Sequence, residues 1–272
     1  MIVLNHLKQE LMEYADRFDA LSLTYDQSQE YGSKLESLLN EFSLFVTNDG
    51  NKAAWNRLSP SELESLESDM QRIRGASASC VAMMEKHRAL RLREGHSSIA
   101  DYFRNIETCI DTEFGGFSVT PHSKVLLVGS GSFPMTPLLI ARRTGAEVVG
   151  IDIDEEAIQL GQEVVDRLGG GLPIRLEHGS VEHLAYTGEA THIIFSSTVG
   201  LKYELLDRLH ALTMEHVVVA MRYGNGLKSL FNYPMQEVDH RKWRLSDRIL
   251  RQDQVFDVAL YTKSGQQPGE EQ

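Results

Sequence analysis

Residues 124–134 read KVLLVGSGSFP, and the segment EVVGID follows at residues 147–152. Both contain a short apolar, β-branched run without strict polar alternation, which is typical of strands that are buried on both faces. Three further runs have the same character: PIRLEH at 173–178, HIIFSS at 192–197 and HVVVAM at 216–221. Helical segments separate the runs, at 134–144, 154–168 and 201–212. This succession predicts a Rossmann-like α/β fold with a doubly wound parallel sheet.

The first hundred residues carry helical periodicity. Apolar side chains recur at steps of three and four over residues 4–21 and 31–45, which predicts two amphipathic helices that pack as a bundle. We expect an all-helical N-terminal domain at 1–118, a Rossmann-like domain at 119–264 and a disordered polar tail at 265–272. Within the second domain, residues 255–263 are expected to form a late antiparallel edge strand.

Another helix in the N-terminal part has a clear start. Ser59 can cap it, Pro60 suits its first turn, and Glu62 completes a capping box. The small residues at 75–80 either break this helix or let a neighbouring element approach closely. A second long helix is expected over about residues 78–93.

The acidic composition narrows the classes of ligand. The 272 residues include 27 Lys and Arg against 39 Asp and Glu, so the net charge is −12. Nucleic acids and anionic membranes are bound chiefly by excess Lys and Arg, so neither is expected as a partner. The apolar runs are too short to cross a membrane, and the N-terminus becomes charged too soon for a signal peptide. We therefore expect a cytoplasmic protein that binds small molecules.

Cysteines and histidines do not form the patterns of a redox or metal site. Cys80 and Cys109 lack CxxC spacing and are expected to be small buried hydrophobic residues. None of the 10 histidines occurs in HxxxH or HExxH spacing. We therefore expect no bound metal ion.

The loop after the first predicted strand is the expected ligand site. Gly129, Ser130 and Gly131 allow a tight turn, and Asp152 lies 21 residues after Gly131, at the end of the second predicted strand. A carboxylate there can accept both hydroxyls of a ribose. Pro134 stands where a dinucleotide fingerprint has its third glycine, which disfavours NAD or FAD. The pattern favours adenosine without a pyrophosphate; a glycine turn that merely connects strand to helix is the structural alternative.

Further residues resemble the adenosine contacts of S-adenosylmethionine-dependent methyltransferases. Ile153 follows the second strand, Ser180 and Val181 follow the third, and Ser196 follows the fourth. Methyltransferases commonly have an acidic residue two positions before the first glycine, where this chain has Leu127. The resemblance implies an ordinary adenosine site and a rearranged site for the methionine end.

Several segments together resemble the nicotianamine synthase family, and in particular its bacterial branch of histidine aminobutanoyltransferases. The matching segments are the glycine loop with Pro134 and Thr136, Val199-Gly200, Met221-Arg222, LFNYP at 230–234, MMEKH at 83–87 and YFRN at 102–105. They lie within roughly residues 80–262, and their combination is far more specific than any one of them.

The resemblance implies an unusual use of S-adenosylmethionine as a co-substrate. Its 3-amino-3-carboxypropyl (aminobutanoyl) group would pass to the amine of histidine, and 5'-methylthioadenosine would leave. Such reactions belong to opine-type metallophore pathways such as those of staphylopine and pseudopaline, with an opine dehydrogenase downstream. The choice between D- and L-histidine, the number of transfers and the oligomeric state stay open, with a homodimer as one option.

Glu85 is the candidate acceptor for the proton of the attacking amine. It shares a predicted helical face with small and apolar residues, among them Ala78, Val81, Ala82, Ala89 and Leu92. Partial burial on that face would raise its pKa and suit it to proton transfer. A surface Glu85 paired with Lys86 or Arg88 is the structural alternative, and the resemblance favours the catalytic role.

Four more residues are candidates for contact with the substrate. Tyr102 is a catalytic candidate that would hydrogen-bond an amine, or else a tyrosine that packs at a hinge. Arg222 is a candidate clamp for a carboxylate, weighed evenly against a surface arginine. Tyr233 is expected to shape the wall of the acceptor pocket. His96 is a further candidate beside the site, with a solvent-facing or packing role as its alternative.

Three other activities are compatible with the same pattern. One is a methyltransferase of a small amine, and a second is nicotianamine synthase proper, which uses several molecules of S-adenosylmethionine. The third is a catalytically silent regulator that binds S-adenosylmethionine and docks a partner through its helical half. The products released from S-adenosylmethionine distinguish these activities.

Overall fold

The computed structural model describes residues 2–24, 26, 28–96, 113 and 115–265. The chain forms two compact units, neither of which is a single stretch of sequence. The helical unit comprises Met1–His87, Tyr223–Met235 and Arg251–Asp257, and the sheet unit comprises Arg88–Arg222, Gln236–Leu250 and Val258–Gln272. This division differs from the predicted ranges, which placed one boundary between residues 118 and 119. Within the part of the chain that the structure describes, no helix combines the length and the apolar composition of a membrane span.

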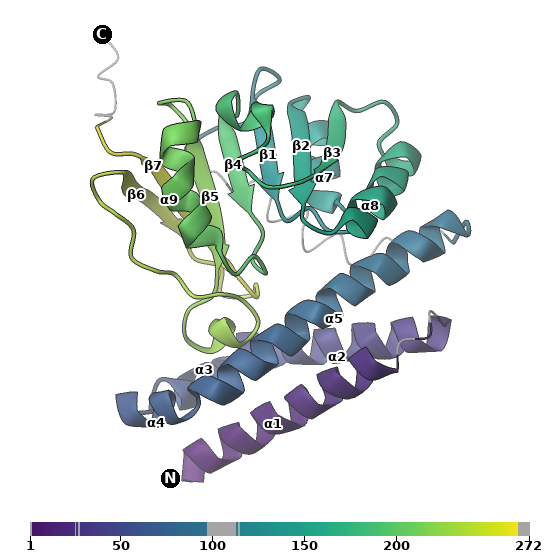
Figure 1. The fold of residues 1–272 in the computed structure, drawn as a ribbon. Coiled ribbons are helices and arrows are strands. Elements are labelled where there is room, and N and C mark those ends of the chain that lie inside the picture. The colour runs from purple at the N-terminus through teal and green to yellow at the C-terminus, as the bar shows by residue number, and fades with distance from the viewer. Residues whose placement is uncertain (1, 25, 27, 97–112, 114, 266–272) are drawn as a thin grey trace. The chain divides into compact units, whose positions relative to one another are not determined.

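The helical unit is built on three long helices (Figure 1). They are α1 (Ile2–Leu23), α2 (Gln29–Thr47) and α5 (Glu67–Arg93), of which the residues up to His87 belong to this unit. The predicted apolar stripes of the first two helices are confirmed, because Phe18 of α1 and Phe42 of α2 are both fully buried with ring centroids 5.3 Å apart. Aromatic packing of this kind therefore joins α1 to α2.

The predicted capping box is present, but the break in the helix lies elsewhere. Ser59 caps α4 (Pro60–Ser65), and the Glu62 carboxylate accepts the Ser59 backbone N–H in return. α4 ends at Ser65, and α5 runs through residues 75–80 without interruption. A glycine costs a helix only about 1 kcal/mol, so packing can outweigh it. The alternative of close approach is confirmed at Cys80, whose Sγ lies 3.6 Å from the carbonyl oxygen of Phe18.

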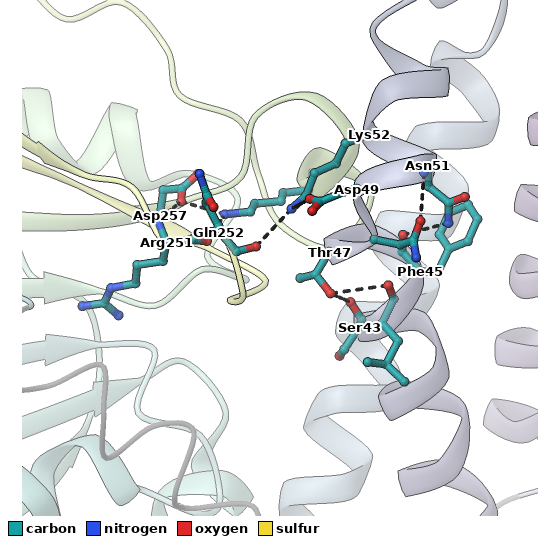
Figure 2. A network of polar contacts seen from close by, with 12 residues as sticks. Ser43, Phe45, Thr47, Asp49, Asn51, Lys52, Arg251, Gln252 and Asp257 are labelled. Atoms are coloured by element: carbon teal, nitrogen blue, oxygen red, sulfur yellow. Dashed lines mark hydrogen bonds and ion pairs between the residues drawn. The ribbon is translucent and has the colours of Figure 1, made fainter.

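Contacts with α2 and α3 (Asp49–Trp55) explain why two late segments of the chain belong to the helical unit. The ring of Phe231 lies 5.4 Å from that of Phe42. Lys52 of α3 donates from Nζ to the carbonyl of Gln252 at 3.1 Å, as Figure 2 shows. The Lys228 ammonium donates to the Asp257 carboxylate at 2.7 Å, and both side chains are buried. Sequence periodicity gave no sign of these contacts, and it also missed α3.

The sheet unit confirms the predicted Rossmann-like arrangement. All five predicted strands are present: β1 (Lys124–Val128), β2 (Glu147–Asp152), β3 (Ile174–His178), β4 (His192–Phe195) and β5 (Val218–Tyr223). The sheet order is β3-β2-β1-β4-β5-β7-β6, and the neighbouring strands from β3 to β5 pair in parallel (Figure 1). The strand order reverses between β1 and β4, which is where open α/β sheets bind ligands.

The last two strands correct the prediction of an edge strand at 255–263. β7 (Asp257–Lys263) is buried along its whole length and lies between β5 and β6. The edge is formed instead by β6 (Trp243–Ile249), which pairs antiparallel with β7 and was not predicted. The charged residues of β6, including Arg244, Asp247 and Arg248, hid it from a search for apolar runs, although charges are a common feature of edge strands.

Three predicted helices flank the strands, with nearly the expected bounds. They are α7 (Met135–Thr144), α8 (Glu155–Leu168) and α9 (Lys202–Leu212). Asp154 caps α8, since its Oδ1 accepts the backbone N–H groups of Glu156 and Ala157 at 2.9 and 3.3 Å. A core of buried side chains joins α7, α8 and the end of α5; it includes Leu92, Phe133, Leu138, Leu160 and Val164. This packing holds α7 and α8 together.

A buried histidine at the start of β4 makes stability depend on pH. Burial lowers the pKa of His192 from its ordinary 6.5 to about 4, and its Nδ1 lies 2.8 Å from Thr191 Oγ1. Between these two values the unfolded chain binds a proton that the folded chain does not. The free energy of unfolding should therefore fall by about 3 kcal/mol as the pH drops from about 6.5 to about 4.

Denaturant titrations at several pH values of the wild type and of His192→Gln test this dependence. The variant should lose this part of the pH dependence, whereas the control His183→Gln, at an exposed histidine, should keep it. Identical pH slopes for the wild type and His192→Gln would contradict the assignment.

Candidate functional site

The loop after β1 needs glycine at two positions. Gly129 and Gly131 have φ angles of 82° and 65°, in the left-handed region that other residues rarely adopt. A Cβ at Gly129 would lie 2.7 Å from Val199 Cγ2. The backbone N–H groups of Gly129 and Ser130 both donate to the carbonyl of Ile151, at 2.9 and 3.0 Å. The loop is thereby held against the end of β2.

Asp152 shapes the same loop through its carboxylate. Oδ2 accepts the backbone N–H of Gly131 at 2.9 Å, and Oδ1 accepts that of Asp154 at 3.1 Å. A carboxylate offers about four acceptor positions, so each oxygen can accept one more hydrogen bond. The side chain is half-buried at the carboxyl end of β2. It can therefore receive two ligand hydroxyls in the orientation that the two N–H groups impose.

Two serines differ in how they use their hydroxyls. Ser196, after β4, donates from Oγ to the carbonyl of Gly129 at 2.7 Å and so ties β4 to the loop. Ser130 is 5% exposed, and its buried Oγ has no hydrogen-bond partner among the described residues. A buried hydroxyl without a partner costs about 1–3 kcal/mol. A polar ligand atom would relieve that cost, so Ser130 fits a bound ligand.

A glycine in α8 takes over the role of the missing third glycine of the loop. A Cβ at Gly161 would lie 2.8 Å from Leu176 Cδ1 and 3.1 Å from the carbonyl oxygen of Gly131, with Pro134 Cδ at 3.5 Å. Gly161 therefore lets α8 approach the loop, and Pro134 can stand at the start of α7. The loop sequence alone gives no sign of Gly161, although a glycine inside an amphipathic helix is a signal of close packing.

Three other residues that the sequence predicts as adenosine contacts follow the carboxyl ends of β2 and β3. Ile153 is 83% exposed, which is unusual for so apolar a side chain, and its carbonyl lies 3.1 Å from His178 Nε2. Ser180 is half-buried. Val181 is buried, and its carbonyl accepts a hydrogen bond from Thr187 Oγ1 at 2.7 Å, so its side chain belongs to the core. An exposed apolar side chain beside Asp152 offers a surface for an aromatic base.

Arg222 clamps a carboxylate, but the carboxylate belongs to the chain itself. Its Nε and one terminal nitrogen donate to Glu113 at 2.6 and 2.7 Å, and that terminal nitrogen also donates to Thr136 Oγ1 at 3.2 Å. Arg222 and Glu113 are 7% and 1% exposed. The alternative of a surface arginine is therefore wrong. Glu113 was missed because it lies 109 residues away in the sequence.

A buried lysine supports Arg222 from α9. The Lys202 ammonium, which is fully buried, donates to the carbonyls of Arg222 and Ser197 at 2.6 and 3.0 Å. These carbonyls follow β4 and end β5, so one cation holds the carboxyl ends of two strands. Lys202 was missed because a lysine in a helical segment normally faces solvent.

Glu85 lies on α5 in the helical unit and is half-buried. On its predicted face, Ala78 and Val81 are half-buried, and Ala82 is exposed. Two residues later, His87 is buried against α2, where a Cβ at Gly32 would lie 2.2 Å from its Nε2. The glycine thus permits a close crossing of α2 and α5 near Glu85.

The crossing predicts opposite effects for two glycine-to-alanine substitutions. Alanine in a helix is favoured over glycine by about 1 kcal/mol, and at Gly75 nothing lies within 4 Å of the new Cβ. Gly75→Ala should therefore raise the free energy of unfolding by about 1 kcal/mol. Gly32→Ala should lower it by about 1–3 kcal/mol, because the imidazole of His87 fills the space. Urea titration checks both, and an equal gain for the two variants would contradict the close crossing.

The other three candidates for substrate contact lie in different parts of the chain. Tyr102 lies outside the described residues. His96 is exposed, and its Nε2 lies 3.8 Å from the Glu94 carboxylate. Tyr233 is half-buried in the helical unit, and its ring lies under the guanidinium of Arg74. Among the described residues there is no group of three or more His, Cys, Asp or Glu side chains that could hold a metal ion.

Comparisons with known proteins agree on one family. A family profile described as nicotianamine synthase protein matches residues 11–267. An L-histidine 2-aminobutanoyltransferase of Pseudomonas aeruginosa is 28% identical over 233 residues, which cover 85% of this chain and 87% of the relative. A relative of the same name from Yersinia pestis is 30% identical over 245 residues, 88% of this chain and 90% of its own.

Solved structures of MtNAS share the fold. A glutamate-to-glutamine variant of MtNAS aligns with a TM-score of 0.75, covering 94% of this chain and 98% of that one. The complex of that variant with S-adenosylmethionine has a TM-score of 0.69 over 92% and 98% of the two chains. MtNAS in complex with MTA and tNA gives 0.74 over 94% and 97%. Sequence identity is 16% in each case, so these structures establish the fold alone.

Proposed function

This chain belongs to the nicotianamine synthase family, and from that premise we propose that it transfers the aminobutanoyl group of S-adenosylmethionine to the amine of histidine. 5'-Methylthioadenosine is the second product. The name shared by the Pseudomonas and Yersinia relatives supports histidine as the acceptor. The chain is accordingly a transferase with S-adenosylmethionine as a co-substrate.

The glycine loop and Asp152 carry the proposal. Asp152 accepts the two ribose hydroxyls, while Gly129, Ser130 and Gly131 bring the backbone close to the nucleoside and Pro134 starts α7 beside it. The free hydroxyl of Ser130 supports this placement, because it needs a polar partner. Ile153 packs against the adenine, and Ser180, Val181 and Ser196 complete that side of the site.

Geometry selects the carbon of the sulfonium that reacts. Every alkyl carbon attached to the sulfonium of S-adenosylmethionine is electrophilic. The histidine nitrogen donates its lone pair to the carbon on the methionine side, and the carbon–sulfur bond breaks with its electron pair left on sulfur. Near-attack positioning can be worth several kcal/mol, so a site that presents this carbon decides the product.

Glu85 receives the proton that the nitrogen loses. A neutral amine becomes cationic as it attacks, so a carboxylate nearby both attracts it and accepts its proton. Tyr102 donates or accepts a hydrogen bond at an amine, and Tyr233 and His96 contact the acceptor. Arg222, whose guanidinium is engaged by Glu113, ties the end of β5 to Thr136 at the start of α7.

The products of one incubation test the proposal. Purified protein is supplied with S-adenosylmethionine and with D- or L-histidine, and the products are identified by mass spectrometry. Methylthioadenosine and a histidine that has gained an aminobutanoyl group are expected. S-Adenosylhomocysteine would identify a methyltransferase instead. Binding of S-adenosylmethionine without any product, with either enantiomer, would identify a silent regulator.

The proposal also covers the location of the enzyme, its pathway and its oligomeric state. We propose a cytoplasmic enzyme whose product passes to an opine dehydrogenase in a metallophore pathway. A homodimer is the proposed assembly, and light scattering of the purified protein measures it. Counting the aminobutanoyl groups on the product separates this activity from that of nicotianamine synthase proper.

A further inference from the structure

Two arginines are buried in the described part of the chain, and their partners differ. Arg222 in the sheet unit is matched by the carboxylate of Glu113. Arg74, on α5 in the helical unit, is 8% exposed and donates from Nε to the carbonyl of Ser229 at 2.6 Å. Its two terminal nitrogens have no acceptor among the residues that the structure describes. One buried guanidinium is therefore neutralised inside the protein and the other is not.

The surroundings of Arg74 orient its guanidinium without supplying an ion pair. Cζ lies 5.4 Å from the centroid of the Tyr233 ring, within the range of a cation–π contact. Glu67, two turns earlier on α5, attracts the guanidinium only at longer range: it forms no ion pair with Arg74 and accepts a hydrogen bond from Gln71 at 2.9 Å. Burial lowers the pKa of Arg74, but an arginine stays charged at neutral pH.

The protein satisfies this group only in part, and its terminal nitrogens keep some exposure, since neither is among the fully buried polar atoms that lack a partner. A buried charge normally persists in proteins only when it is paired and hydrogen-bonded. Nε is fixed by Ser229 and the face of the group by Tyr233, so the terminal nitrogens are oriented in advance. A planar fork of this kind matches the two oxygens of a carboxylate. A ligand carboxylate would supply both the charge and the acceptors that are missing.

We propose that Arg74, stacked on Tyr233, binds the α-carboxylate of an amino-acid substrate and so determines which amines react. This assignment rests on the proposed function, in which both substrates carry such a group. The acceptor has the carboxylate of histidine, and the donor has the methionyl carboxylate of S-adenosylmethionine. Arg74 takes the role of carboxylate clamp for which Arg222 was one candidate.

The acceptor arm compares histidine with histamine, which has the same imidazole and amine but lacks the carboxylate. If Arg74 binds the acceptor, kcat/KM of the wild type should favour histidine by about 10- to 100-fold. Arg74→Gln should abolish this preference by lowering the value for histidine alone. Arg74→Lys keeps the charge but loses the fork, so it should keep part of the preference.

The donor arm measures the Kd of S-adenosylmethionine by calorimetry. If Arg74 binds the methionyl carboxylate, Arg74→Gln should raise that Kd about 10- to 100-fold and lower kcat/KM equally for both acceptors. Either arm supports the proposal and identifies the source of the carboxylate. The proposal is overturned if a folded Arg74 variant keeps both the preference for histidine and the Kd of S-adenosylmethionine.

Controls separate this result from loss of structure and from failure of the proposed function. Arg72→Gln changes an exposed arginine of the same helix, which pairs with Asp16 and Asp19, and should leave every value unchanged. If Arg74→Gln does not fold by circular dichroism, Arg74→Lys decides. If the wild type releases no methylthioadenosine, the proposed function fails. Calorimetry with histidine, histamine and S-adenosylmethionine then still tests Arg74.

Discussion

Replacement of Glu85 by Gln is expected to lower kcat for methylthioadenosine release by about 10²- to 10⁴-fold, the usual contribution of a general base. The glutamine has nearly the same shape and keeps a hydrogen-bonding oxygen, but it cannot take the proton from the attacking amine. The Kd of S-adenosylmethionine should stay nearly unchanged, because the proposed nucleoside contacts do not include Glu85. Single-turnover kinetics and calorimetry measure the two quantities separately.

A matched control shows whether the loss is specific. Glu64→Gln makes the same chemical change at an exposed position in the helical unit and should not alter kcat. Glu85→Gln should melt close to the wild-type temperature, since Glu85 is half-buried. An undiminished kcat would remove Glu85 from the mechanism and favour its structural role.

Replacement of Asp152 by Ala should weaken binding of S-adenosylmethionine by about 10²- to 10⁴-fold. Hydrogen bonds to a charged acceptor contribute about 1.5–3 kcal/mol each, and the ribose would lose two of them. The variant also leaves the N–H groups of Gly131 and Asp154 without their acceptor, so the loop loses its fixed shape. Calorimetry measures the affinity directly.

Two further variants separate the ribose contacts from the loop. Asp152→Asn keeps one carbonyl oxygen and should lose less affinity than Asp152→Ala. Asp166→Ala, at an exposed aspartate of α8 that accepts from Gln162 at 2.8 Å, should bind S-adenosylmethionine like the wild type. Wild-type affinity in Asp152→Ala would exclude the proposed nucleoside site.

Local patterns predicted the framework of the sheet unit and its ligand loop. The five parallel strands, the glycines of the loop and the position of Asp152 are encoded by neighbours in the sequence. Apolar runs report burial on both faces, and a positive φ demands glycine at a particular position. The capping box at Ser59 could be read for the same reason, because its partners are three residues apart.

Contacts between distant residues were decided only by the tertiary structure. The position of β6 at the sheet edge and of β7 inside the sheet depends on which strands pair. The sequence pattern of a single strand does not say which strand lies beside it. Arg222 and Arg74 have the same side chain and similar burial, yet one meets Glu113 from 109 positions away and the other meets Ser229 from 155. The sequence by itself determined which residue types stand where strands end; only folding decided which charges are neutralised, because a counter-ion is chosen by proximity in space.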